Sequence, residues 1–164
     1  MATTEKTLAD LFLENLKDTY SAEKQIVRAL SKMTKAAASQ ELAQAFETHR
    51  GETETHVERL EQVFEMMGKA ARTKTCQAMQ GLIEEANEVA QEFKGSGALD
   101  AALVAAAQEV EHYEIARYGS LKSWARELGM DDAVKLLDQT LEEEKKTDKL
   151  LTAFAEQQAN RQAA

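Results

Sequence analysis

Proline is absent from this chain of 164 residues, and cysteine, glycine and aromatic residues are scarce. The single cysteine, Cys76, cannot form an internal disulfide, which favours a reducing compartment. We interpret Cys76 as a small, partly buried residue. Alanine, leucine, glutamate, lysine and glutamine are abundant, and all of them favour helices. Because valine, isoleucine and aromatic residues are too few for a sheet, the composition predicts an all-α protein.

A surplus of basic residues is also missing. The chain carries 29 acidic residues against 20 lysines and arginines, a net charge of −9, so nucleic acids and anionic membrane surfaces would repel it. No segment approaches the roughly 18 consecutive apolar residues of a membrane span. Residues 1–6 have neither the basic start nor the apolar run of a signal peptide. We therefore expect a cytoplasmic protein that binds neither nucleic acid nor membranes.

Helical periodicity marks four long segments and one shorter segment. The predicted helices span residues 7–38, 40–67, 76–93, 98–128 and 132–157. Ser39 and Asp131 are predicted N-caps, and Gly68 and Gly129 are predicted stops. The apolar line of the first helix is Leu13, Leu16, Tyr20, Val27 and Leu30. We expect one domain over residues 1–164, with frayed ends at about 1–6 and 158–164.

The lengths of these helices constrain their arrangement. At 1.5 Å per residue the long helices each reach roughly 40 Å, so they must lie side by side. Short connections join the first long helix to the second and the third to the fourth, which predicts two antiparallel hairpins. The short helix then belongs to the crossover between them. Hairpin, crossover and hairpin is the order of ferritin-like four-helix bundles, which is the predicted fold.

Each long helix places charged or polar residues where its apolar stripe should continue. These residues are Glu23 in the first helix, His49, Glu52 and His56 in the second, Glu111 and Glu114 in the third, and Glu144 and Asp148 in the fourth. A buried carboxylate costs several kcal/mol unless it is paired or coordinated, and crowded like charges need a counter-charge. We therefore predict a pair of divalent cations in the core. Carboxylate oxygens with imidazole nitrogens suit iron, manganese or zinc better than calcium.

Taken singly, these residues also have ordinary structural interpretations. Glu23 could lie at an interface, Glu144 in a solvated run of glutamates, and His49 in a hydrogen-bonded core position. The prediction of a metal site therefore depends on the coincidence across four helices.

Helical spacing leaves the ligand set open. His49 and Glu52 are three residues apart, and Glu52 and His56 are four apart, so either histidine can share a metal with Glu52. Only Glu109 and His112 follow the Glu-x-x-His order of carboxylate-bridged di-metal bundles.

Four stretches of the sequence resemble the YciE/YciF family of ferritin-like proteins. They are residues 18–25, 76–87, 110–116 and 141–148, and the run Glu-His-Tyr-Glu-Ile-Ala at 111–116 is the most specific of them. The likeness covers about residues 8–155. It implies a bacterial, stress-associated protein with a ferritin-like fold, a homodimer, and a di-iron centre of the ferroxidase type.

Matching motif positions to this family implies a set of site residues. The implied metal ligands are Glu23, His49, Glu52, Glu111, Glu114 and Glu144, with His56, His112 and Asp148 as alternates or as hydrogen-bonding partners of the ligands. Tyr20 lies one turn from Glu23, so we expect it to hydrogen-bond to a ligand carboxylate.

Two classes of function fit these expectations. In the first, two iron ions react with oxygen or peroxide, so the protein is a ferroxidase-type oxidoreductase. In the second, the protein binds metal without turnover or acts as a structural stress dimer. A large iron-storage cage is disfavoured, because the sequence has no evident surfaces for assembling many copies.

Overall fold

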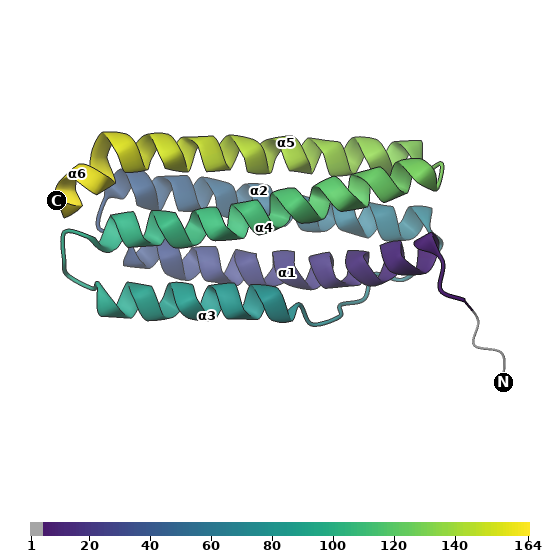
Figure 1. Ribbon diagram of the computed structural model, residues 1–164, viewed down its shortest axis with the longest axis horizontal. Coiled ribbons are helices and arrows are strands. Elements are labelled where there is room, and N and C mark those ends of the chain that lie inside the picture. Colours follow the sequence, from purple (N-terminus) through teal and green to yellow (C-terminus); the bar gives the residue numbers. More distant parts are fainter. Residues whose placement is uncertain (1–4) are drawn as a thin grey trace.

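The computed structural model describes residues 5–164, and four long helices dominate it (Figure 1). They are α1 (Leu8–Ala36), α2 (Gln40–Met66), α4 (Leu99–Glu127) and α5 (Asp131–Phe154). The shorter α3 (Gln77–Glu92) lies beside α1 and α4. α1 packs mainly on α2 and α4 mainly on α5, so two antiparallel hairpins are joined by the crossover that contains α3. The predicted all-α, ferritin-like bundle is confirmed.

The described residues contain no helix that is both long enough and apolar enough to cross a membrane.

Helix boundaries follow local capping chemistry. Thr7 and Asp10 form a capping box, in which each side chain accepts a hydrogen bond from the other residue's backbone N–H, at 3.3 and 2.9 Å. Ser39 caps α2 as expected. Gly129 ends the turn after α4 with a positive φ of 69°, which glycine adopts without steric cost. Asp131, predicted as a cap, is instead the first residue of α5, and Met130 holds the cap position without a side-chain bond.

The C-terminal segment differs from the frayed tail predicted for 158–164. α5 continues through a π-helical turn, Ala155–Ala159, into α6 (Asn160–Ala163). Ala159 is fully buried, and a Cβ atom on Gly97 would lie 2.9 Å from the carbonyl oxygen of Gln162. This close approach to the loop before α4 gives the segment a packing surface that periodicity alone does not reveal. The predicted fraying at residues 1–4 lies outside the described residues.

A buried carboxylate joins the two hairpins at one end of the bundle. Asp100, in the first turn of α4, accepts hydrogen bonds from the backbone N–H groups of Ala38 and Ser39, each at 2.8 Å. These groups lie in the turn between α1 and α2. Asp100 therefore links the start of α4 to the first hairpin.

Two apolar clusters fill the bundle, one toward each end. One includes Ile26, Phe46 and Leu103, and the other includes Phe12 and Tyr118. In α1 Leu16, Tyr20 and Leu30 are buried as predicted, whereas Leu13 and Val27, which we predicted to face inward, are only partly buried. Phe12 and Ile26, which lie beside that line, are buried as well. Polar residues lie between the two clusters.

Candidate metal centre

Six acidic or histidine side chains converge between the two apolar clusters. They are Glu23 from α1, His49 and His56 from α2, Glu111 and Glu114 from α4, and Glu144 from α5. None is more than 4% exposed. They form two groups that share Glu144, and within each group one potential ligand atom per residue lies within 4.8 Å of the others. The four helices therefore interrupt their apolar stripes at the same depth.

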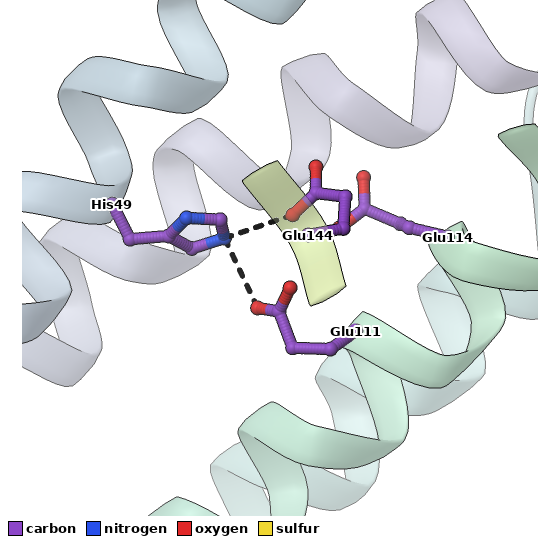
Figure 2. A group of neighbouring side chains, drawn as sticks. All are labelled: His49, Glu111, Glu114 and Glu144. Carbon is purple, nitrogen blue, oxygen red and sulfur yellow. Dashed lines mark ion pairs between the residues drawn. The ribbon is translucent and has the colours of Figure 1, made fainter. Parts of the chain in front are cut away.

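The first group surrounds the ring of His49 (Figure 2). Its Nε2 atom lies 3.0 Å from Oε1 of Glu111 and 3.7 Å from Oε2 of Glu144. Glu114, one turn along α4 from Glu111, completes this group. The other ring nitrogen of His49, Nδ1, faces the hydroxyl of Thr147 at 3.3 Å. His49 thus directs one nitrogen to the carboxylates and the other to a supporting hydroxyl.

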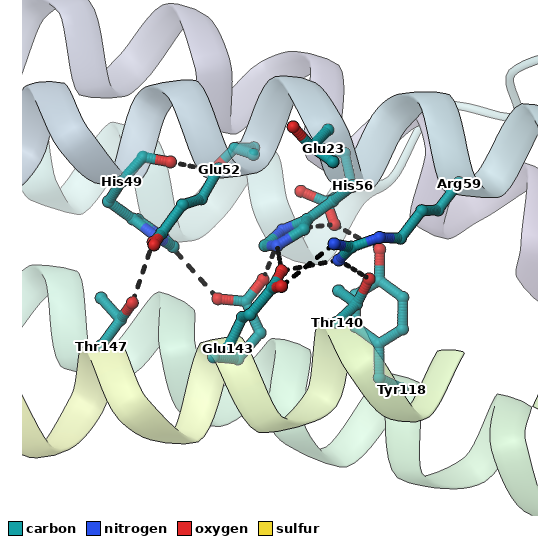
Figure 3. Close-up of polar contacts among 12 residues, drawn as sticks. Glu23, His49, Glu52, His56, Arg59, Tyr118, Thr140, Glu143 and Thr147 are labelled. Carbon is teal, nitrogen blue, oxygen red and sulfur yellow. Dashed lines mark hydrogen bonds and ion pairs between the residues drawn. The ribbon is translucent and has the colours of Figure 1, made fainter. Parts of the chain in front are cut away.

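The second group surrounds His56 (Figure 3). Its Nδ1 atom lies 2.8 Å from Oε1 of Glu144 and 3.7 Å from Oε1 of Glu23. On the opposite side of the ring, Nε2 lies 2.9 Å from Oε2 of Glu143. Arg59 donates two hydrogen bonds to the same Glu143 carboxylate, at 2.6 and 3.0 Å. A carboxylate behind the ring fixes the imidazole orientation and favours a proton on Nε2, which leaves Nδ1 free to accept or to coordinate.

Tyr118 supports the second group from α4. Its hydroxyl donates a hydrogen bond to Oε1 of Glu23, and the ring is fully buried. The second oxygen of Glu23 has no hydrogen-bond partner. The tyrosine thus holds one oxygen of this carboxylate and leaves the other free.

The cluster lacks hydrogen bonds to an unusual extent. Among the described residues, eight buried side-chain nitrogen or oxygen atoms have no hydrogen-bond partner, and all eight belong to the six clustered residues. Both oxygens of Glu114 and both oxygens of Glu144 are among them. The 2.8 Å approach of His56 Nδ1 to Glu144 is a close charge contact whose orientation does not suit a hydrogen bond. Buried polar atoms are normally satisfied, so such a concentration calls for a ligand.

The electrostatics of the cluster point the same way. Burial, together with the nearby Glu144, Glu23 and Glu111 carboxylates, raises the pKa of Glu114 well above its usual range. Burial also raises the pKa of Glu111 to about 8, although the His49 cation opposes it. Without a metal, the cluster therefore retains protons near neutral pH.

The two histidines take up charge in the same way. Burial alone would lower the pKa of His56, but the Glu144 and Glu23 carboxylates outweigh it and raise that pKa to about 9. The pKa of His49 is likewise raised, because Glu111 outweighs burial. For Glu144, burial acts to raise the pKa, but contact with His56 and His49 lowers it. Protons occupy the cluster as the positive charges that its carboxylates require.

The residues present fit a metal site. The free atoms are carboxylate oxygens and imidazole nitrogens, the donors that suit iron, manganese and zinc. They come from separate helices that are each anchored in packed apolar layers. Burying several carboxylates is costly without a counter-charge, and a bound cation supplies one. The cluster is therefore suited to hold a metal ion.

Several of the predicted site residues lie outside the two groups. The Glu52 side chain is 33% exposed, and its Oε2 atom is 3.5 Å from His49 Nδ1, on the side of the ring away from Glu111. His112 is 67% exposed and pairs with Asp148 at 3.1 Å on the surface of the bundle. The Tyr20 hydroxyl donates to Glu61 at 2.7 Å, not to a cluster carboxylate.

Other contributors were missed from the sequence. Tyr118, Arg59 and Glu143 were not among the predicted site residues. Tyr118 lies four residues after Glu114, so the helical period places both on one face and could have indicated its proximity. No comparable signal in the sequence pairs Arg59 of α2 with Glu143 of α5.

Two antiparallel hairpins, a long crossover and a core of buried glutamates and histidines define a ferritin-like bundle of the carboxylate–histidine type.

Comparison with known proteins shows the family to which the chain belongs. Residues 7–164 match the family described as "Domain of unknown function (DUF892)". Protein YciF of Escherichia coli K12 is 52% identical over 160 residues, which cover 96% of both chains. The chain therefore belongs to the DUF892 family, which includes YciF, as the resemblance predicted.

Solved structures agree with this assignment. The crystal structure of the E. coli stress protein YciF matches with a TM-score of 0.91 at 50% identity, covering 95% of this chain and 99% of that one. YcfI from Rhodopseudomonas palustris matches with a TM-score of 0.88 at 47% identity, covering 93% and 97%. A Xanthomonas campestris protein at 18% identity shares the fold, with a TM-score of 0.72.

Proposed function

We propose that the buried cluster binds two metal ions, with iron as the native metal, and that the protein oxidises Fe(II) with oxygen or peroxide. The observation that carries this proposal is the set of eight buried, partnerless donor atoms confined to six residues. These residues fall into two groups that share one carboxylate. Two adjacent ion sites, with Glu144 available to both, would account for this pattern.

Each group supplies the donors for one ion. His49, Glu111 and Glu114 would serve the first ion, Glu23 and His56 the second, and Glu144 would offer one oxygen to each. A pair of metal ions supplies redox or Lewis-acid chemistry on a small bound molecule. The protein's part is to orient the imidazoles, to keep the carboxylates free of competing hydrogen bonds, and to exclude bulk water.

Hydrogen bonds behind the ligands support this role. Glu143 and Arg59 hold the His56 ring so that Nδ1 faces the cluster, and Tyr118 orients Glu23. Partners of this kind typically change metal affinity 10- to 100-fold when they are removed.

The test uses metal-stripped protein and a matched pair of variants. Anaerobic Fe(II) addition should give two ions per chain, and exposure to air or peroxide should then produce ferric absorbance faster than in buffer. Glu144→Gln should lose both the bound ions and the ferric absorbance. Glu142→Gln should behave like the wild type, because Glu142 is an exposed neighbour paired with Lys145. Failure of the wild type to oxidise Fe(II) above the buffer rate with either oxidant would refute the enzymatic part.

A second candidate function is metal binding without turnover in a structural stress protein. It is favoured by the relatives, since E. coli YciF is described as a stress protein and YcfI has been given a provisional structural role. Stoichiometric iron that is never oxidised catalytically would support this alternative.

We also propose that the protein is a cytoplasmic homodimer that binds neither nucleic acid nor membranes. The exposed apolar side chains Leu11 and Met66, 46% and 45% exposed, offer a surface for a second copy, and the net charge of −9 disfavours anionic partners. Light scattering should give twice the chain mass for the wild type and a lower mass for Met66→Gln. A monomeric wild type would contradict the dimer.

A further inference from the structure

A pocket lies between α1, α3 and α4 and reaches the buried carboxylate–histidine cluster at Glu111. Its volume is about 380 Å³, within the usual range for small-molecule sites. Its walls are aliphatic or small, and include Leu30, Met33, Ile83, Ala106 and Ala107. Aliphatic walls without polar partners favour an apolar occupant over water.

The pocket lining follows the length of α1, which suits an extended aliphatic chain. On α1 its lining extends from Ile26 to Ala36, which corresponds to about 15 Å of helix. α4 runs antiparallel to α1 (Figure 1) and contributes the stretch from Leu103 to Glu111, while α3 contributes the stretch from Ile83 to Gln91. The alanines on α3 and α4 leave the space that larger side chains would fill.

The inner end of the pocket and its exposed edge differ in polar character. The inner end is formed by Glu111, whose Oε1 atom contacts His49 in the cluster and whose Oε2 atom is buried without a partner. Lys32 is exposed and is the only basic residue of the lining, and Asn87 and Gln91 of α3 are exposed lining residues as well. An anionic head group would be attracted to Lys32, because no other residue of the lining is basic.

We propose that this pocket binds a medium-chain aliphatic carboxylate, with its carboxylate at Lys32 and its chain directed toward Glu111. This inference deepens the proposed function, because the aliphatic chain would lie beside the proposed metal site. It rests on the proposed function only in that respect. Binding itself requires no metal. The two ideas can therefore be tested separately on the same protein.

The first experiment is calorimetric titration of the full chain with acetate, hexanoate, octanoate and decanoate. Acetate should not bind, and affinity should rise about fourfold for each added methylene while the chain remains inside the pocket. Decanol, which has the same chain but no charge, should also bind. Absence of decanoate binding, or affinity independent of chain length, would overturn the proposal.

Variants locate the binding. Ala106→Phe places a ring in the pocket and should weaken decanoate binding at least 10-fold, and Ala86→Leu on α3 provides a second block should the first variant fail to fold by circular dichroism. Lys32→Gln should weaken decanoate about 3- to 5-fold and leave decanol unchanged. Lys35→Gln, an exposed lysine of α1 outside the pocket, is the matched control. Unaltered decanoate affinity in both blocked variants would overturn the assignment to this pocket.

Co(II) loading, followed by absorbance, separates this inference from the proposed function. Co(II) uptake without decanoate binding would refute the pocket proposal and leave the metal centre standing. Decanoate binding that is lost in the blocked variants, in a protein that takes up no Co(II), would support the pocket and remove the metal centre.

Discussion

Glu114 offers a direct test of the cluster in metal-free protein. Both of its carboxylate oxygens are buried without partners, and burial with three nearby carboxylates raises its pKa well above the ordinary value of 4.5. Glu114→Gln keeps the shape of the side chain and removes the titrating proton. We expect the metal-free variant to be more stable than the wild type at pH 7 and to bind less metal.

The magnitude follows from the cost of keeping the carboxyl protonated. Relative to the ordinary pKa of 4.5, holding Glu114 neutral at pH 7 costs about 3 kcal/mol, at about 1.36 kcal/mol per pKa unit. For a chain of this size that corresponds to an increase in Tm of roughly 6–12 °C in the variant. The variant avoids this cost because an amide does not titrate.

The stability advantage of Glu114→Gln over the wild type depends on pH. Because the folded-state pKa of Glu114 is raised, the stability linked to its protonation is fully present below pH 4.5 and is lost as the pH rises toward the folded-state pKa. At pH 5 the advantage of Glu114→Gln should therefore shrink to about 1 kcal/mol or less.

Thermal unfolding with a chelator, at pH 5 and pH 7, measures both effects. Glu109→Gln, an exposed glutamate on the same helix, is the control and should change Tm little at either pH. A Glu114→Gln variant that is less stable than this control at pH 7, or whose gain does not depend on pH, would refute the reasoning. It would mean that Glu114 is ionised and compensated within the metal-free bundle.

Three further outcomes are expected. Mn(II) affinity measured by calorimetry should rise from pH 6 to pH 9. A bound ion displaces protons from His56 and Glu111, whose pKa values are about 9 and 8. A flat profile would argue against binding at these residues. Tyr118→Phe should lower metal affinity about 10-fold without loss of helix by circular dichroism. Tyr20→Phe should leave metal affinity unchanged, because the Tyr20 hydroxyl contacts Glu61 and not the cluster. Equal losses of affinity in the two variants would contradict the orienting role of Tyr118. Asp100→Ala should lower the free energy of urea unfolding by about 1–3 kcal/mol, because two backbone N–H groups lose their partner. Its metal stoichiometry should remain unchanged. An unaltered unfolding midpoint would show that the contact contributes nothing to stability.

The sequence by itself determined the bundle and the depth of the polar layer. A 3.6-residue period fixes which residues share a face, so Glu23, Glu111, Glu114 and Glu144 could be assigned to the inward stripes from spacing alone. The cost of burying like charges then predicted a cation among them. The assignment of residues to faces involves one helix at a time and succeeds because helical geometry is local, whereas the predicted cation depends on the coincidence of these residues across four helices.

Only the tertiary structure decided which neighbours complete the site. On α2 the spacing allowed Glu52 to share a metal with either histidine, but the rotation of the helix brings both His49 and His56 inward and leaves Glu52 partly exposed. Likewise the register between α1 and α4 places Tyr118, not Tyr20, on Glu23. Rotation and register depend on how side chains of different helices pack against one another, and the period of a single helix carries no information about that packing.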